Sequence, residues 1–155
     1  VNTVQAVAQR ADEFPMFKKS TQVLTAVMAE ESFSGFVASV VQSDTVGRRS
    51  IFGIKQLANV GQIEDAVEQA NLFTESEYSY DIRSEALQIL TQHDHVASNW
   101  LSRAEELFEE ADPRIRFLVV GGLERNLNDK IRAFLSDYLQ DEYDARVHHK
   151  IRQIL

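Results

Sequence analysis

Hydrophobic residues recur along this chain with the spacing of amphipathic helices. Phe33, Phe36, Val37, Val40 and Val41 follow the i, i+3, i+4, i+7, i+8 pattern, which places them on one face of a helix. Similar stripes return along most of the sequence, and no stretch alternates between apolar and polar residues long enough to favour a strand. The pattern predicts an all-α protein.

The stripes and the turns between them predict five helical hairpins. The first helices of the pairs are expected at residues 2–12, 33–42, 63–73, 95–109 and 127–139. The second helices are expected at residues 15–29, 47–59, 81–91, 113–124 and 145–155. A single hairpin of this size cannot bury its own apolar face, so stacked neighbours are needed.

The chain also repeats itself. Three segments start on a polar residue, carry Ile or Val three residues later and close on Leu: 79–90, 112–123 and 144–155. Asp112 is a candidate N-cap, and Pro113 stands where the first helical residue should be. Asp44 to Leu57 and the region around Leu24 continue the spacing more loosely. The repeat of about 32–33 residues predicts a helical solenoid.

The segment Asp112 to Arg116, which reads D-P-R-I-R, resembles the start of the second helix in the HEAT family of repeats. Ser79 to Arg83 keeps the Ile and the Arg, whereas Asp144 to His148 keeps the Asp and a Val. The resemblance implies a right-handed α-α superhelix of about five hairpins, with residues 1–155 as one repeat domain. It also implies that the second helices line the concave face. A weaker likeness is to the C-terminal helical domain of zinc aminopeptidases, although the chain has no H-E-x-x-H motif.

Charge separates by helix. The chain has 155 residues and a net charge of -8, which disfavours a general coat for nucleic acid or membranes. The second helices with their preceding turns nevertheless sum to about +6, and the first helices to about -9. If the resemblance holds, the concave face is basic and the convex face acidic.

Seven basic residues are therefore candidates for binding an acidic peptide or a partner domain: Lys55, Arg83, Arg116, Arg125, His149, Lys150 and Arg152. A structural role competes with binding for those near helix starts, because Arg83, Arg116 and Arg146 could each pair with an Asp and tie one repeat to the next. Lys55, Arg125, Lys150 and Arg152 lie later in their helices, where such ties explain them less well.

Little in the sequence indicates catalysis. There is no cysteine, so thiolate zinc sites and cysteine nucleophiles are excluded. His93-Asp94-His95 offers adjacent ligands without a third, and His148-His149 do not share a helix face. Glu105-Glu106 and Glu109-Glu110 are expected on a solvated face. Val120-Gly121-Gly122 lies inside a helix and predicts close packing of helices rather than a phosphate loop. We expect no catalytic residue, metal or cofactor.

These observations favour a non-enzymatic interaction or scaffold module. An auxiliary helical domain of a larger enzyme and a HEAT-like nucleic-acid binder are the alternatives. We expect a cytoplasmic protein without a membrane span, either a processed product or a piece of a longer chain because it starts at Val1. Ile151, Ile154 and Leu155 predict an apolar edge at the C-terminus, which a second copy or a neighbouring domain would cover.

Overall fold

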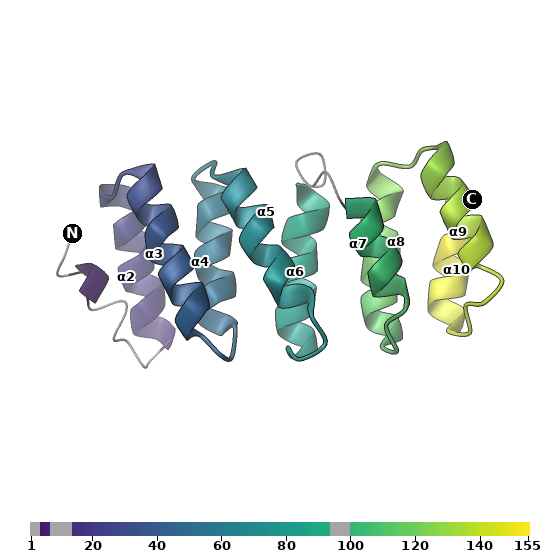
Figure 1. Ribbon diagram of the computed structural model, residues 1–155, viewed down its shortest axis with the longest axis horizontal. Helices are drawn as coiled ribbons and strands as arrows, with labels where there is room; N and C mark the ends of the chain where they lie inside the picture. Colours follow the sequence, from purple (N-terminus) through teal and green to yellow (C-terminus); the bar gives the residue numbers. More distant parts are fainter. Residues whose placement is uncertain (1–3, 7–13, 94–99) are drawn as a thin grey trace. The chain divides into compact units, whose positions relative to one another are not determined.

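The amphipathic stripes of the sequence form helices in the computed structural model, which describes residues 4–6, 14–93 and 100–155 (Figure 1). Every regular element over these residues is helical, so the predicted all-α class is confirmed. The helices are α2 (Phe14–Val27), α3 (Glu30–Ser43), α4 (Arg48–Asn59), α5 (Ile63–Asn71), the short 3-10 helix η1 (Leu72–Thr74), α6 (Tyr80–Gln92), α7 (Trp100–Phe108), α8 (Pro113–Arg125), α9 (Asp129–Tyr138) and α10 (Ala145–Ile154).

All five predicted second helices are present as α2, α4, α6, α8 and α10, each within two residues of the expected ends. Three predicted first helices correspond to α3, α5 with η1, and α9. Most of the predicted helix 2–12, and the beginning of the one predicted at 95–109, lie outside the described residues. The chain divides into two compact units, Val1–Ile89 and Leu90–Leu155, hereafter unit 1 and unit 2.

Unit 1 has two layers of helices. In Figure 1, α3 and α5 lie in front of α2, α4 and α6, and α4 contacts α2, α3 and α5. The predicted stripe is buried at Phe33, Phe36, Val37 and Val40. Val37 packs closely against Gly53 on α4, since a Cβ at Gly53 would lie only 3.3 Å from a Val37 methyl carbon. The core of unit 1 is therefore aromatic and aliphatic, and α4 is its centre.

Unit 2 packs α8 against both α7 and α10. Asp112 and Asp144 cap α8 and α10, accepting hydrogen bonds from the backbone N–H of Arg114 at 2.9 Å and of Arg146 at 3.0 Å. Pro113 is the first helical residue, as the sequence predicted. Equivalent carboxylate caps 32 residues apart give successive second helices the same local start.

The C-terminal helix does not present the expected apolar edge. Ile151 and Ile154 are 0% and 8% exposed, because they face into unit 2, whereas Leu155 is 43% exposed. Arg132 donates hydrogen bonds to the carbonyl oxygens of Ile154 at 3.3 Å and Leu155 at 3.4 Å, which satisfies the end of α10. The prediction was wrong for both isoleucines, whereas Leu155 is exposed as expected. The second copy or neighbouring domain expected at this end stays a prediction.

Candidate functional site

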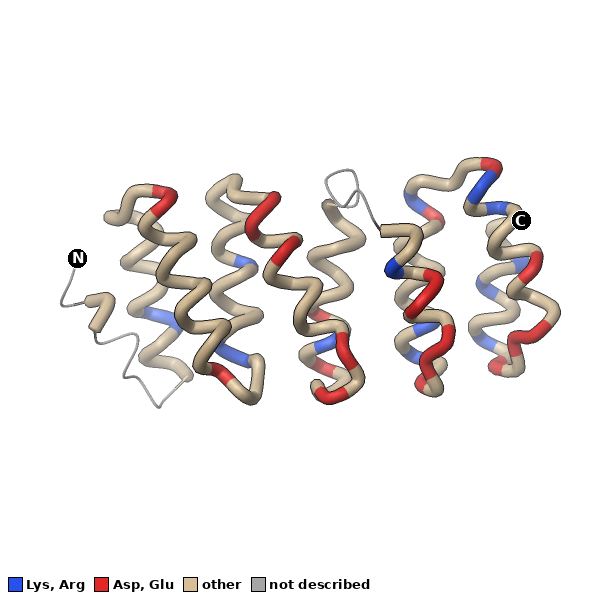
Figure 2. The backbone as a smooth tube through the Cα atoms, viewed as in Figure 1, with Lys and Arg blue, Asp and Glu red and all other residues tan. Residues whose placement is uncertain are grey.

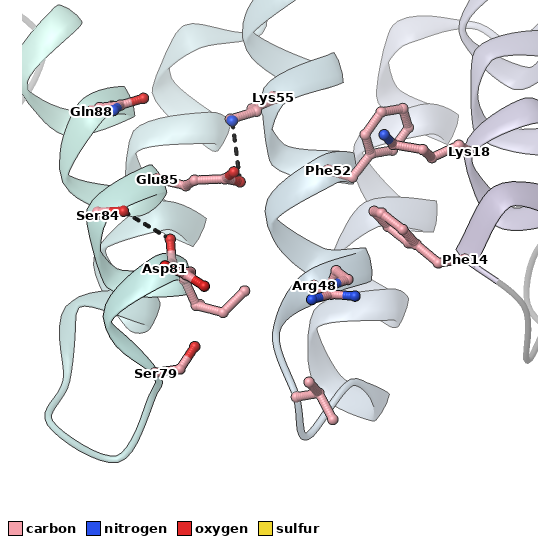
Figure 3. Close-up of a pocket in the computed structure, with 12 residues that line it drawn as sticks. Phe14, Lys18, Arg48, Phe52, Lys55, Ser79, Asp81, Ser84, Glu85 and Gln88 are labelled. Atoms are coloured by element: carbon pink, nitrogen blue, oxygen red, sulfur yellow. Dashed lines mark hydrogen bonds and ion pairs between the residues drawn. The ribbon is translucent and has the colours of Figure 1, made fainter.

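A cleft of about 490 Å³ lies in the layer of second helices of unit 1, bordered by α2, α4 and α6 (Figure 3). Its volume is within the ~300–1,000 Å³ typical of ligand sites. The side chains that line it come from the three helices and the turns before α4 and α6: Phe14, Lys18, Val46, Arg48, Phe52, Lys55, Ser79, Asp81, Ile82, Ser84, Glu85 and Gln88.

Aromatic rings form the apolar part of the cleft. The rings of Phe14 and Phe52 meet edge to face, with centroids 6.1 Å apart and planes at 86°. Buried Phe17 supports both, at 6.5 Å from Phe14 and 6.3 Å from Phe52. Such edge-to-face pairs stabilise by about 0.5–1.5 kcal/mol beyond the area they bury, so these rings are held in place before any ligand arrives.

Two cations lie against these rings. The Nζ of Lys18 is 5.0 Å from the ring centroid of Phe14 and 5.2 Å from that of Phe52. The guanidinium carbon of Arg48 is 5.8 Å from the Phe14 centroid. Both residues are exposed, so the rings position the charges without taking them out of water. An anionic group on a ligand could approach both cations above an apolar floor.

The opposite wall of the cleft is polar and acidic. Figure 3 shows Asp81, Ser84, Glu85 and Gln88 on α6, facing the side chains of α2 and α4. The Nζ of Lys55 on α4 lies 3.1 Å from a carboxylate oxygen of Glu85, with both side chains partly exposed. This ion pair connects the two walls, and exposure limits its contribution to about 0–1 kcal/mol.

A turn built on Asp44 positions the start of α4. Its carboxylate is buried and accepts hydrogen bonds from the backbone N–H of Ser50 at 2.9 Å and from the Ser50 hydroxyl at 3.1 Å. Gly47 caps the helix with a φ of 84°, in the left-handed region that glycine favours. A Cβ there would lie 3.0 Å from a methyl carbon of Ile82, so this glycine also allows close approach of α6. The turn therefore sets where Arg48 enters the cleft.

The structure separates the predicted binding residues into different environments. Lys55 lines the cleft. Arg83 is buried, and its Nε donates to the carbonyl oxygen of Thr74 at 2.9 Å, so it presents no charge at the surface of unit 1. In unit 2, Arg125 donates to the carbonyl oxygen of Thr91 at 3.0 Å. The Nζ of Lys150 lies 2.7 Å from a carboxylate oxygen of Glu124. His149 and Arg152 are exposed on α10.

Arg116 is held by hydrogen bonds inside unit 2, as expected of the structural role that the sequence offered as the alternative to binding. Its Nε and Nη2 donate to the two carboxylate oxygens of buried Glu142, at 2.9 and 2.8 Å, and its Nη1 donates to the carbonyl oxygen of Glu110. The sequence led us to expect an Asp as the partner of Arg116, whereas in the structure the partner is Glu142. Arg114 and Arg146 pair instead with Asp112 and Asp144, the caps of their own helices.

Burial and hydrogen bonding shift the pKa values around this pair. Burial of Glu142 opposes its ionisation, but hydrogen bonds from Arg116 and from the Asp144 backbone N–H lower its pKa below the usual value. Burial, together with the Glu142 charge, raises the pKa of Tyr138 to about 12, and the Tyr138 hydroxyl donates to the Phe108 carbonyl oxygen at 2.9 Å. Glu142 is therefore ionised at neutral pH and holds Arg116 inside the fold.

Of the residues that line the cleft, sequence reasoning had named only Lys55 as a binding candidate, and it missed the aromatic and cationic wall formed by Phe14, Lys18, Arg48 and Phe52. A signal for them exists. Phe14 and Lys18 are four residues apart on one second helix, and Arg48 and Phe52 repeat that spacing on the next. Positions i and i+4 share a helix face, so each pair predicts an aromatic–cationic face. Only the packing of α2 beside α4 brings the two faces together.

The other residues that the sequence weighed for chemistry are glutamates and histidines of unit 2. Glu105, Glu106 and Glu109 are exposed, as expected of a solvated face, and Asp94 and His95 of the His93-Asp94-His95 segment lie outside the described residues. Over residues 4–6, 14–93 and 100–155, no group of three or more His, Asp or Glu could hold a metal ion. In the same part of the chain, no helix has the length and apolar character needed to cross a membrane. Figure 2 shows how the charges are distributed over the helices of each unit. In unit 1, Lys and Arg are mainly on α2 and α4 and acidic residues are prominent on α5, whereas α6 carries both signs. In unit 2, acidic residues are prominent on α7.

No protein-family model, curated protein or solved structure matches this chain.

Proposed function

We propose that this chain is a HEAT-like array of helical hairpins that works as a non-enzymatic protein-interaction module. In this proposal, the cleft between α2, α4 and α6 binds a short acidic segment of a partner protein. The observation that carries the proposal is the combination of Lys18 and Arg48 with the Phe14–Phe52 pair on one wall of the cleft. The cations would bind a carboxylate, and the rings would pack against a neighbouring apolar side chain.

The solenoid part of the proposal rests on the repeat in the sequence and on the equivalent caps of α8 and α10. Arrays of this kind commonly bind extended segments along the layer of second helices. The exposed His149 and Arg152 on α10, with Arg125 on α8, form a further set of binding candidates in unit 2. Arg83 and Arg116 are left out of the proposed binding set because their guanidinium groups are engaged inside their own units.

A protein segment fits the cleft better than nucleic acid does. The carboxylates of Asp81 and Glu85 stand on the wall opposite the cations, where they would repel a phosphate backbone. A peptide can present one acidic side chain to Lys18 and Arg48 while its backbone amides face the polar groups of α6. Ser84 and Gln88 provide such groups on that wall.

Selection from a random heptapeptide library displayed on phage tests this function. We expect the wild-type protein to enrich peptides that combine Asp or Glu with an apolar residue. The double variant Lys18→Glu with Arg48→Glu should bind the corresponding synthetic peptides about tenfold more weakly or worse, because two favourable charge contacts become repulsive. Fluorescence polarisation with labelled peptides measures the change in Kd.

The matched control is Lys19→Glu, which reverses the charge of the neighbouring exposed lysine on α2 that does not line the cleft. Its peptide affinity should equal that of the wild type, and all variants should unfold at the same temperature by circular dichroism. The proposal fails if no acidic peptide is enriched, or if Lys19→Glu weakens binding as much as the double variant Lys18→Glu with Arg48→Glu does.

A further inference from the structure

We infer that the cleft recognises a pair of opposite charges, so that its peptide ligand carries an acidic and a basic side chain at a fixed spacing. This inference rests on the proposed function and specifies its ligand. It is carried by the division of charge between the two walls: Lys18, Arg48 and Lys55 stand on α2 and α4, whereas Asp81 and Glu85 stand on α6 (Figure 3).

The ion pair between Lys55 and Glu85 neutralises one charge on each wall. Within the described residues, no carboxylate lies within ion-pair distance of Lys18 or Arg48, and no cation lies within that distance of Asp81. The cleft thus keeps two cations against the aromatic rings and one carboxylate on the opposite side. A ligand with a single sign of charge would satisfy one wall and be repelled by the other.

The spacing of the ligand charges is set by the separation of the two walls. Because Lys18 and Arg48 lie on one wall and Asp81 on the other, the acidic and basic residues of an extended segment that crosses the cleft are separated by a constant number of positions. A residue beside the acidic one would lie over the rings of Phe14 and Phe52, so it should be apolar.

The two walls carry opposite charges, so each charge of the ligand has its own partner. The acidic side chain of the peptide goes to Lys18 and Arg48, and the basic side chain goes to Asp81. Ser84 donates its hydroxyl hydrogen to the backbone carbonyl oxygen of Asp81 at 3.0 Å, which leaves the Asp81 carboxylate available for this contact.

Double-mutant cycles between protein and peptide test the inference, using the synthetic peptides obtained from the phage selection. We expect these peptides to share a basic residue at a constant spacing from the acidic one. Replacing that basic residue with Gln should weaken binding to the wild type by about three- to fivefold, as expected of a partly exposed ion pair. The same replacement should have no effect on binding to the Asp81→Asn variant, whereas replacing the acidic residue should still weaken it.

The control is Asp137→Asn, which removes an exposed carboxylate on α9 of unit 2 and should leave the peptide preference unchanged. Selected peptides that carry acidic residues but no basic residue at constant spacing would overturn this inference and leave the proposed function standing. An unchanged effect of replacing the basic residue on binding to Asp81→Asn would also overturn it. Absence of any enriched acidic peptide would overturn the proposed function, and this inference with it.

Discussion

Two adjacent glycines on α8 should respond in opposite ways to the same substitution. Gly122 is buried, and a Cβ built on it would lie 2.3 Å from the methyl carbon of Thr91 and 3.0 Å from an aromatic carbon of Trp100. Gly121 is open on that side, because its Cβ would meet only the Lys150 side chain at an ordinary 3.6 Å. Replacing each with Ala therefore separates the effect of packing from the effect of helix propensity.

The two effects have known sizes. Replacing Gly with Ala inside a helix stabilises by about 1 kcal/mol, and this gain applies at both positions. At Gly122 the added methyl group overpacks the contact with Thr91 and Trp100, which costs about 1–3 kcal/mol. We expect Gly121→Ala to raise the free energy of unfolding of unit 2 by about 0.5–1 kcal/mol. Gly122→Ala should lower it by up to about 2 kcal/mol, the difference between the two effects.

Urea unfolding followed by tryptophan fluorescence measures both variants. Trp100 is the only tryptophan of the chain, is 7% exposed and lies in unit 2, so its emission reports that unit. With a urea m-value of about 2 kcal/mol/M, the midpoint should rise by up to about 0.5 M in Gly121→Ala and fall by up to about 1 M in Gly122→Ala. If Gly122→Ala is as stable as Gly121→Ala, α8 does not approach Thr91 and Trp100 as described.

Two further predictions concern Glu142 and its surroundings in unit 2. Arg116→Met leaves the buried Glu142 carboxylate without its guanidinium partner and should lower the free energy of unfolding by about 3–5 kcal/mol. Arg146→Met removes an exposed ion pair and should change the urea midpoint little. Equal urea midpoints for the two variants would contradict this prediction. Folding lowers the pKa of Glu142, and it lowers the pKa of Asp144 to about 2. Both carboxylates therefore stabilise unit 2 fully when the pH is above their unfolded pKa values of about 4, and this stabilisation is lost as the pH falls through the folded pKa values. The urea midpoint should therefore fall between pH 5 and pH 2, and less steeply in Glu142→Gln; identical slopes for wild type and Glu142→Gln would disprove the role of this carboxylate.

The helices could be predicted from the sequence because their causes are local. On α8, Ile115, Val119 and Leu123 are spaced by one turn, and all three are fully buried. Asp112 and Pro113 mark where that helix begins, since a cap and a first-turn proline act on the residues beside them. Positions and ends of helices thus follow from side chains within a few residues.

The roles of the charged residues could not be predicted in the same way. In sequence, Lys55, Arg83 and Arg116 are similar cations on second helices, yet one lines a cleft and the other two are engaged inside their units. Their environments depend on Glu85, Thr74 and Glu142, which come from other helices or turns. Only burial and the partner within reach decide whether a cation is structural or available.

The cleft shows the same limit. The sequence determined that Arg48 and Phe52 share one helix face, because 3.6 residues per turn bring positions four apart together. Phe14 shares a face with Lys18 in the same way once α2 begins at Phe14, one residue before its predicted start. Tertiary structure decided that these two faces meet each other and stand opposite Asp81. Whether two helix faces meet depends on how closely the helices pack, for example at Gly47, where the absence of a side chain lets α6 approach. The spacing of residues along one helix does not encode the distance to the next helix.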